Sequence, residues 1–283
     1  MIKQVAVIND LSGLGRCSLT AAIPVLSVMG IQPCPLPTAI LSNQTGYSSY
    51  FCRDFTECMD AYIHEWKKRK LRFDGIYTGF LGSEKQIQII LNFVKDFQTE
   101  KTFLLVDPVM GDDGVTYDIY GSNFVSQMKR LIHHADIITP NLTELCLLTD
   151  TNYMTLTGKR KTSDYLDSIA QLGRTLFQEK TKAIIVTGIL YQSVSDTESR
   201  YYNLVIEPNQ VTAISSKIYG KSYSGTGDLL ASVVCGGMVK GDSVRKSVCK
   251  AVRFLETALM ETVKEHTSKN DGIHFEPYLH LLL

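Results

Sequence analysis

The chain of 283 residues is 44% hydrophobic and 20% charged, which is the balance of an ordinary globular protein. Lysine plus arginine equals aspartate plus glutamate at 29 each, so the formal net charge is zero and no long-range field attracts nucleic acid or anionic lipid. No run approaches the ~20 apolar residues of a membrane helix, and the first residues lack the cleavage site of a secretory signal. We therefore expect a cytoplasmic protein that binds neither nucleic acid nor membranes.

Apolar strands alternate with amphipathic helices in the first half of the chain. The pattern predicts strands at residues 5–9, 73–80 and 102–109, and helices at residues 18–29, at residues 57–70 and from Ser83 onward. Residues 32–41 are extended but contain prolines at positions 33, 35 and 37. Because proline donates no hydrogen bond to a sheet, this segment is predicted to be an edge strand or an irregular one.

The second half continues the alternation. It predicts strands at residues 135–139 and 182–187, an edge hairpin at 200–215, and two helices within 227–266 that part at Gly241-Asp242. Because these apolar runs suit strands buried on both faces, we expect an α/β fold of three layers, αβα, with a mainly parallel central sheet. No linker or repeat divides the sequence, so residues 1–283 are predicted to form a single domain.

A glycine-rich loop precedes the first of the last two helices. Gly225 and Gly227 flank Thr226, and Asp228 follows them. Glycines let the backbone approach a ligand closely, and the amino end of a helix offers free N–H groups, so this loop predicts an anion site. Asp228 is then either an acid that only stabilises the helix or a general base that deprotonates a hydroxyl attacking a γ-phosphoryl group.

Acidic residues follow two of the predicted strands. Asn141 and Glu144, three residues apart after strand 135–139, fit a helix capping box, a magnesium site, or both. Asp107 and Asp112 follow strand 102–109, where a carboxylate is costly unless it is paired or bound to a metal. The alternative at that place is an ordinary acidic turn.

Four segments together resemble one enzyme family. The sequence GTGD at 225–228 resembles the signature of ribokinase-like kinases. DPVMGD at 107–112, TPNLTE at 139–144 and SNQTGY at 42–47 resemble segments of its pyridoxal kinase branch, and the set runs in the expected order through nearly the whole chain. The resemblance implies a ribokinase-like fold and the MgATP-dependent phosphorylation of the 5′-hydroxymethyl group of pyridoxal, pyridoxine or pyridoxamine, in a protein that is a homodimer.

The same resemblance assigns roles to individual residues. It implies that Asp228 is the catalytic base and that the anion hole is formed by Gly225, Thr226 and Gly227. It implies that ATP is contacted by Asp107, Thr139, Asn141, Thr187 and Thr226, and magnesium by Asp112 and Glu144. The pyridine substrate would face Asp10, Thr45, Phe80 and Asp228, under a lid formed by residues 114–120. A monovalent cation, K⁺ or Na⁺, is implied near Asp107 and Thr139.

Two positions depart from the pyridoxal kinase pattern. Asp10 stands where many of these kinases carry a serine at the ring nitrogen, and an aspartate there favours a protonated ring through a charge-assisted hydrogen bond. Phe80 stands where a ring-stacking tyrosine is common, so the hydroxyl is lost. Asp10 also resembles the acidic first loop of the hydroxymethylpyrimidine kinases of thiamine synthesis, which therefore remain the alternative.

Two further classes of protein were weighed. The Gly13-Leu14-Gly15 segment after the first strand imitates a dinucleotide-binding loop, but it has no third glycine and no acidic residue on the second strand, which argues against an oxidoreductase. A nucleotide-binding regulatory protein without activity is the remaining alternative, although such a protein would not need Asp228 inside the anion loop.

Overall fold

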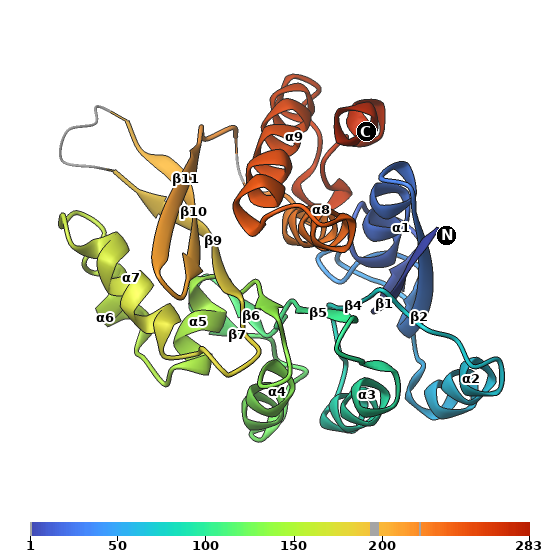
Figure 1. Cartoon of the computed structure of the whole chain (residues 1–283). Helices are drawn as coiled ribbons and strands as arrows, with labels where there is room; N and C mark the ends of the chain where they lie inside the picture. The colour runs from blue at the N-terminus through green and yellow to red at the C-terminus, as the bar shows by residue number, and fades with distance from the viewer. Residues whose placement is uncertain (1, 193–197, 221) are drawn as a thin grey trace.

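The computed structural model describes residues 2–192, 198–220 and 222–283 (Figure 1). A central sheet is built from β1 (Lys3–Ser12), β2 (Ile31–Leu41), β3 (Cys52–Asp54), β4 (Gly75–Thr78), β5 (Phe103–Val106), β8 (Ile137–Ile138), β9 (Ala183–Tyr191), β10 (Arg200–Glu207) and β11 (Gln210–Ser216). These nine strands lie in the order β11-β10-β9-β8-β5-β4-β1-β2-β3. The six strands from β9 to β2 pair in parallel, whereas β3, β10 and β11 pair antiparallel, so the mainly parallel sheet and the edge hairpin are confirmed.

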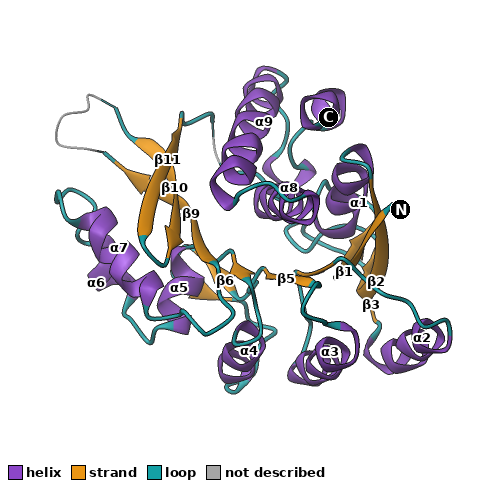
Figure 2. Cartoon of the chain, viewed as in Figure 1, coloured by secondary structure: helices purple, strands orange, loops and turns teal. Residues whose placement is uncertain are grey.

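Helices cover both faces of the sheet (Figure 2). One face carries α1 (Ser18–Val28), α8 (Thr226–Lys240) and α9 (Val244–Lys264). The opposite face carries α2 (Thr56–Lys68), α3 (Glu84–Phe97), α4 (Phe124–Ile132), α5 (Leu142–Leu148), α6 (Tyr153–Thr157) and α7 (Tyr165–Arg174). The predicted three-layer αβα fold is therefore confirmed. None of the helices in the described ranges is both long enough and apolar enough to span a bilayer.

Strand β1 contributes side chains to two hydrophobic cores, one on each face of the sheet. Its successive side chains point to opposite faces of the sheet, and all of them are apolar from Val5 to Ile8. Val5 and Val7 join the core beneath α1, α8 and α9, while Ala6 and Ile8 join the core on the other face. A strand with two buried faces must run through the middle of the sheet, and β1 does so between β4 and β2.

The proline-rich segment forms β2, the second strand from one end of the sheet, and its proline-containing part lies at the open edge. β2 pairs in parallel with β1 along its length, and β3 lies outside it. However, β3 pairs only with residues 39–41 of β2, so the part that holds Pro33, Pro35 and Pro37 has no strand on its outer side. The three prolines alternate along β2 and share one orientation, which places their missing N–H groups on the open side.

Several elements were not predicted from the sequence. A two-stranded sheet of β6 (Gly111–Asp112) and β7 (Val115–Thr116) follows β5, and only β7 lies within the predicted lid of residues 114–120. Helices α4, α6 and α7 were also missed, as were two 3₁₀ segments after α9, η1 (Lys269–Asp271) and η2 (Glu276–Leu282). The break between α8 and α9 is confirmed at Gly241, whose φ of 93° ends α8.

Candidate active site

The carboxyl ends of neighbouring strands are joined to one another at one edge of the sheet. The Asp107 N–H donates to the Thr78 carbonyl at 2.8 Å, and the Thr139 N–H donates to the Val106 carbonyl at 3.1 Å. The Thr187 N–H then donates to the Pro140 carbonyl at 2.9 Å. The loops that follow β4, β5 and β8 are thereby held together at one edge, beside Thr187 of β9, where open α/β sheets bind their ligands.

The two glycines of the anion loop serve different purposes. Gly225 precedes α8 with φ of 81°, and a Cβ atom there would lie 1.9 Å from the Arg16 carbonyl oxygen, so the fold itself requires glycine. Gly227 lies in the first turn of α8, and a Cβ atom there would have no neighbour within 4 Å. The amino end of α8 therefore faces open space at Gly227, as an anion site requires. The Thr226 hydroxyl donates to the Tyr223 carbonyl at 2.8 Å and so closes the turn.

Asp228 lies in the first turn of α8 and is bound by Asn9 of β1. The Asn9 Nδ2 group donates to Asp228 Oδ1 at 3.0 Å. Burial of the carboxylate raises the pKa of Asp228 to about 6; the nearby charge of Asp10 adds to this rise, while the Ser18 backbone N–H and Asn9 oppose it. The group is thus mostly ionised near neutral pH and still basic enough to accept a proton, which suits a general base.

Asp107 directly follows β5 and is only 8% exposed. The Thr139 hydroxyl donates to its Oδ1 atom at 2.9 Å, which confirms that these two predicted residues meet. Burial and the charge of Asp228 together raise the pKa of Asp107 to about 7, although the hydrogen bond from Thr139 opposes the rise. No lysine or arginine of the described residues forms an ion pair with Asp107 or Asp228.

Glu144 and Asn141 form the predicted capping box at the start of α5. The Asn141 N–H donates to Glu144 Oε2 at 2.8 Å, and the Glu144 N–H donates to Asn141 Oδ1 at 2.9 Å. The Met110 N–H donates to the second carboxylate oxygen of Glu144 at 3.1 Å. Burial, together with the charges of Asp107 and Asp112, raises the pKa of Glu144 well above its ordinary value. The capping interpretation is therefore confirmed, and it places this carboxylate beside Asp107.

The other residues that were predicted to contact the ATP phosphates or magnesium lie around the Glu144 carboxylate. Asn141 Nδ2 donates to the Gly111 carbonyl at 2.8 Å, and Asn141 forms a parallel bridge with Thr187. Asp112 is exposed in β6, and its Oδ1 atom accepts the Asp113 N–H at 2.9 Å. The Gly114 N–H donates to the Thr143 hydroxyl at 2.8 Å, so the β6–β7 hairpin is attached to α5.

Within the described ranges no group of three or more His, Cys, Asp or Glu side chains is arranged to hold a metal ion. The donor set does fit a magnesium ion that arrives with nucleotide, because Mg²⁺ keeps several waters and takes its other ligands from phosphate and one or two carboxylates. Burial and the charges of neighbouring carboxylates raise the pKa values of Asp107 and Glu144, and a cation bound beside them would oppose that rise.

Asp10 lies at the other end of the site, where the β1–β2 register shifts between Asn9 and Leu11. Its two carboxylate oxygens accept hydrogen bonds from the Ser12 hydroxyl at 2.7 Å and the Ser18 hydroxyl at 2.5 Å. Burial raises the pKa of Asp10, while these two hydroxyls oppose the rise. Ser18 adopts φ of 51°, a left-handed conformation that is unusual for serine. Both partners of Asp10 were missed from the sequence.

Asn9 is the central residue that sequence reasoning did not select. Its Oδ1 atom accepts the N–H of Asp10 at 3.0 Å and the N–H of Phe80 at 2.9 Å, while its Nδ2 group binds Asp228. A Cβ atom at Gly79 would lie 2.3 Å from Asn9 Nδ2, so the glycine makes room for this side chain. The available signal was a polar residue that ends a buried apolar strand, since such residues need full hydrogen bonding.

Phe80 and Thr45 are also placed at this end. The Phe80 side chain is partly buried, and its ring centroid lies 6.5 Å from that of Tyr120. Thr45 is exposed in the loop after β2, between Gln44 and Gly46. The Leu14 N–H donates to the Ser42 carbonyl at 3.0 Å and the Gln44 N–H donates to the Leu14 carbonyl at 3.1 Å, which joins this loop to the one that follows β1.

The nine-stranded αβα fold, with an open anion loop and a carboxylate at the amino end of α8, defines the class of ribokinase-like small-molecule kinases. The model of the phosphomethylpyrimidine kinase family matches residues 18–272, and the chain belongs to this family.

Two solved structures and one curated relative extend this result. A candidate phosphomethylpyrimidine kinase from Bacteroides thetaiotaomicron, in a crystal form with pyridoxal, is 38% identical, covers 100% of this chain and 96% of its own, and has a TM-score of 0.88. Pyridoxal kinase from Lactobacillus plantarum is 27% identical, covers 100% and 97% respectively, and has a TM-score of 0.87. The pyridoxine/pyridoxal/pyridoxamine kinase of Bordetella avium is 24% identical over 252 residues, which are 87% of this chain and 80% of the relative. The predicted resemblance to pyridoxal kinases is confirmed.

Proposed function

We propose that this protein is a kinase that transfers the γ-phosphoryl group of ATP to the 5′-hydroxymethyl group of pyridoxal, pyridoxine or pyridoxamine. The observation that carries this proposal is the position of Asp228. Its carboxylate, with a pKa of about 6, lies at the amino end of α8 beside open space, and Asn9 joins it to the loop that contains Asp10. This arrangement supports Asp228 as a proton acceptor between the proposed anion site and the proposed site for a polar ring.

The chain's own residues supply the steps of the reaction. Asp228 accepts the proton of the substrate hydroxyl while that oxygen forms a bond to the γ-phosphorus and the bond from phosphorus to the departing ADP oxygen breaks. The N–H groups at Gly225, Thr226 and Gly227 stabilise the charge on the transferred group, as does the positive end of the α8 dipole. Asn9 holds the carboxylate in place through its hydrogen bond of 3.0 Å.

Cations complete the phosphate end. Asp112 and Glu144 would hold magnesium through water, and Asp107, Thr139, Asn141 and Thr187 would line the channel for the ATP phosphates. Magnesium, when bound with ATP, neutralises phosphate charge and aligns the transferred group. A monovalent cation, K⁺ or Na⁺, beside Asp107 and Thr139 would offset the buried charge that raises the pKa of Asp107 to about 7. Residues 114–120, which include β7, serve as the lid.

At the substrate end, Asp10 faces the ring nitrogen, Phe80 packs on the ring, and Thr45 contacts its polar substituents. We further propose that the enzyme works as a cytoplasmic homodimer, which is what its resemblance to pyridoxal kinases implies.

The alternative substrate is hydroxymethylpyrimidine or its phosphate, as in thiamine synthesis. Two observations favour it: the matching family is described as phosphomethylpyrimidine kinase, and the first loop carries an acidic residue at Asp10. The Asp228 half of the mechanism is common to both reactions.

The experiment is turnover with MgATP on pyridoxal, pyridoxine, pyridoxamine and hydroxymethylpyrimidine, measured in parallel. A preference of tenfold or more in kcat/KM for any B6 vitamer supports the proposal, since it corresponds to about 1.4 kcal/mol of transition-state discrimination. A similar preference for the pyrimidine transfers the assignment to thiamine synthesis. Absence of phosphorylation on all four alcohols would contradict the kinase mechanism.

A further inference from the structure

The turn η1, far along the chain from the site residues, lies among the loops of the site. Its residue Lys269 accepts the Ser224 N–H on its carbonyl at 3.1 Å. Ser224 directly precedes Gly225, so this bond attaches the turn to the anion loop. Nothing in the sequence around residues 268–272 predicted a contact with the site.

The same turn holds the loop that carries Thr45. Gln44 Nε2 donates to the Asn270 carbonyl at 3.1 Å, and Asn270 Nδ2 donates to the Gly46 carbonyl at 2.7 Å. These two bonds flank Thr45 on both sides. The fit is close, because a Cβ atom at Gly46 would lie 2.7 Å from Asn270 Oδ1. One residue further along each segment, the Tyr47 hydroxyl donates to the Asp271 carboxylate.

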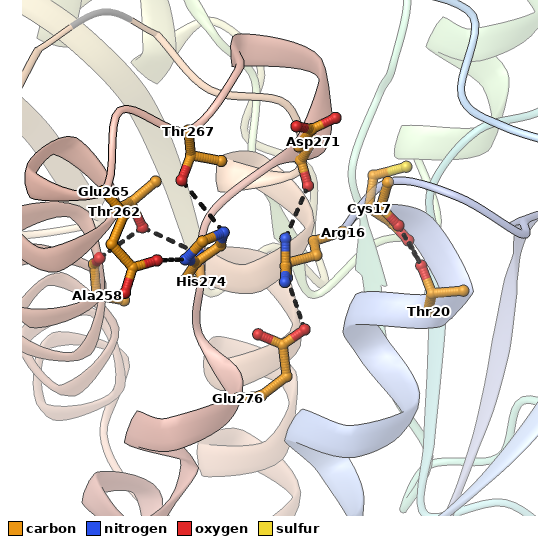
Figure 3. A network of polar contacts seen from close by, with 11 residues as sticks. Arg16, Cys17, Thr20, Ala258, Thr262, Glu265, Thr267, Asp271, His274 and Glu276 are labelled. Carbon is orange, nitrogen blue, oxygen red and sulfur yellow. Dashed lines mark hydrogen bonds and ion pairs between the residues drawn. The ribbon is translucent and has the colours of Figure 1, made fainter.

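Arg16 attaches the third loop. Its guanidinium donates to the Asp271 carbonyl at 3.2 Å and forms an ion pair with Glu276 at 2.6 Å, as Figure 3 shows. The Arg16 carbonyl is the atom against which Gly225 packs. The turn therefore contacts the loop after β1, the loop after β2 and the loop before α8.

The turn itself is anchored to α9. The His274 N–H donates to the Thr262 hydroxyl at 2.9 Å, and the His274 ring contacts the Thr267 hydroxyl at 3.2 Å and the Glu265 carboxylate (Figure 3). On the far side, Ile273 and Phe275 are buried in the core beneath α8 and α9. Because these contacts fix the segment around the turn, residues 269–271 can act as a support for the three loops that they contact.

We propose that Asn270 is a positioning residue that holds Thr45 in its substrate-binding place, and that η1 links the substrate loop to the anion loop. This inference rests on the proposed function for the substrate-binding role of Thr45 and for the identity of the alcohol substrate. Thr45 is exposed, so its own packing does little to fix it, and the paired bonds to Asn270 reduce the freedom of the loop before substrate binds. Such pre-ordering improves substrate binding without contributing to the chemical step.

The test compares Asn270→Ala with Asn92→Ala, a control on the exposed surface of α3. Loss of the bond from Asn270 Nδ2 to Gly46 is expected to raise the KM of the alcohol substrate about 2- to 10-fold, while the KM of ATP and the Tm stay unchanged. Tyr47→Phe removes the neighbouring bond to Asp271 and is expected to act in the same direction. Asn92→Ala should match the wild type in every measurement.

A purely structural role would give a different result. In that case Asn270→Ala would lower the Tm and raise both KM values together, or would change nothing, and either result overturns the inference. Amide hydrogen exchange of residues 42–47, expected to be faster in Asn270→Ala than in the wild type, tests the loop contact without any substrate. A wild type that phosphorylates none of the alcohols would contradict the proposed function, whereas unaltered exchange and unaltered KM in the variants of an active enzyme would contradict only the role of Asn270.

Discussion

The phosphate end and the substrate end of this site are built on opposite principles. At the phosphate end, the carboxylates of the buried Asp107 and Glu144 and of the half-buried Asp228 have raised pKa values, and no described lysine or arginine pairs with them. At the substrate end, Asp10 is also a buried carboxylate with a raised pKa, but it accepts hydrogen bonds from two serine hydroxyls, and the exposed Thr45 loop is held by neutral hydrogen bonds to Asn270.

This difference has a physical consequence. Unpaired buried charge destabilises the free protein, and binding of a cation with nucleotide relieves it, so the phosphate end is electrostatically prepared for its ligand. The loss of one neutral hydrogen bond changes the free energy of binding only slightly, so it should change substrate affinity by a small factor. Substitutions that remove a carboxylate at the phosphate end should therefore lower the rate strongly and raise the stability of the free protein. Substitutions in the substrate loop should mainly change KM.

The largest expected effect is that of Asp228→Asn. The substituted amide keeps an oxygen that can accept the bond from Asn9, but it cannot accept the substrate proton. The kcat should fall about 10²- to 10⁴-fold, which is the usual contribution of a general base. Nucleotide binding, measured by calorimetry, should survive because the glycine loop is unchanged. A kcat within a fewfold of the wild type would contradict the assignment of Asp228 as base.

The next effect separates the two glycines of the anion loop. Gly227→Ala should fold normally, since a Cβ atom there meets nothing within 4 Å and alanine favours the helix by about 0.5–1 kcal/mol. The added methyl group would occupy the space assigned to the transferred phosphoryl group, so kcat/KM for ATP should fall about 10²-fold.

Gly225→Ala is the contrasting variant. Its Cβ atom would lie 1.9 Å from the Arg16 carbonyl, and its φ of 81° disfavours alanine, so this variant should fail to give a stable protein. Circular dichroism melts and nucleotide titrations of both variants measure the difference. Full activity in Gly227→Ala would contradict the assignment of an anion site at the amino end of α8.

The local parts of this molecule could be predicted from the sequence. The Asn141–Glu144 capping box needs residues only three apart, and the strand–helix alternation gave the αβα layers correctly. The contacts of Asn9 with Asp228 and of Asn270 with Gly46 join residues 219 and 224 positions apart, and no periodic pattern marks them. The same holds for β3, whose three residues all are exposed and carry no apolar signal of burial.

A smaller effect tests whether the residue at position 9 influences the pKa of Asp228. In the wild type, kcat/KM should fall as the pH drops through about 6, because Asp228 must be ionised to act as base. Asn9→Asp keeps the Oδ1 acceptor for the Asp10 and Phe80 N–H groups but places a second carboxylate against Asp228. Like charge raises a carboxyl pKa, so the acidic limb should move upward by about one pH unit.

The control for this shift is Asn92→Asp, which adds the same charge on the exposed face of α3. Both variants and the wild type are measured on one substrate, so that titration of the substrate ring cancels between them. An unchanged acidic limb in Asn9→Asp would show that the limb does not report Asp228.

The smallest expected effect concerns stability. It tests whether the buried charge of Asp107 destabilises the free protein. Asp107 has a pKa of about 7 in the folded protein against an ordinary value of 3.8, so the folded state binds its proton more tightly than the unfolded state does. Stability from this group is therefore present below pH 4 and is lost as the pH rises through 7. Asp107→Asn keeps an acceptor for the Thr139 hydroxyl and removes the charge, so at pH 8 the free protein should gain about 1–3 kcal/mol while activity falls.

Thermal melts of the ligand-free protein between pH 4 and pH 8 follow this effect, with Asp60→Asn on the exposed surface of α2 as the control. The gain from Asp107→Asn should be much smaller at pH 4, where the carboxyl group is protonated in the folded state and partly protonated in the unfolded state, and Asp60→Asn should show little change at any pH. Excess MgATP should also stabilise the wild type more than the variant, because the variant has no buried charge for the cation to relieve. A loss of stability at pH 8 in Asp107→Asn would mean that Asp107 is already paired in the free protein, and the contrast between the two ends of the site would then rest on Glu144 and Asp228 alone.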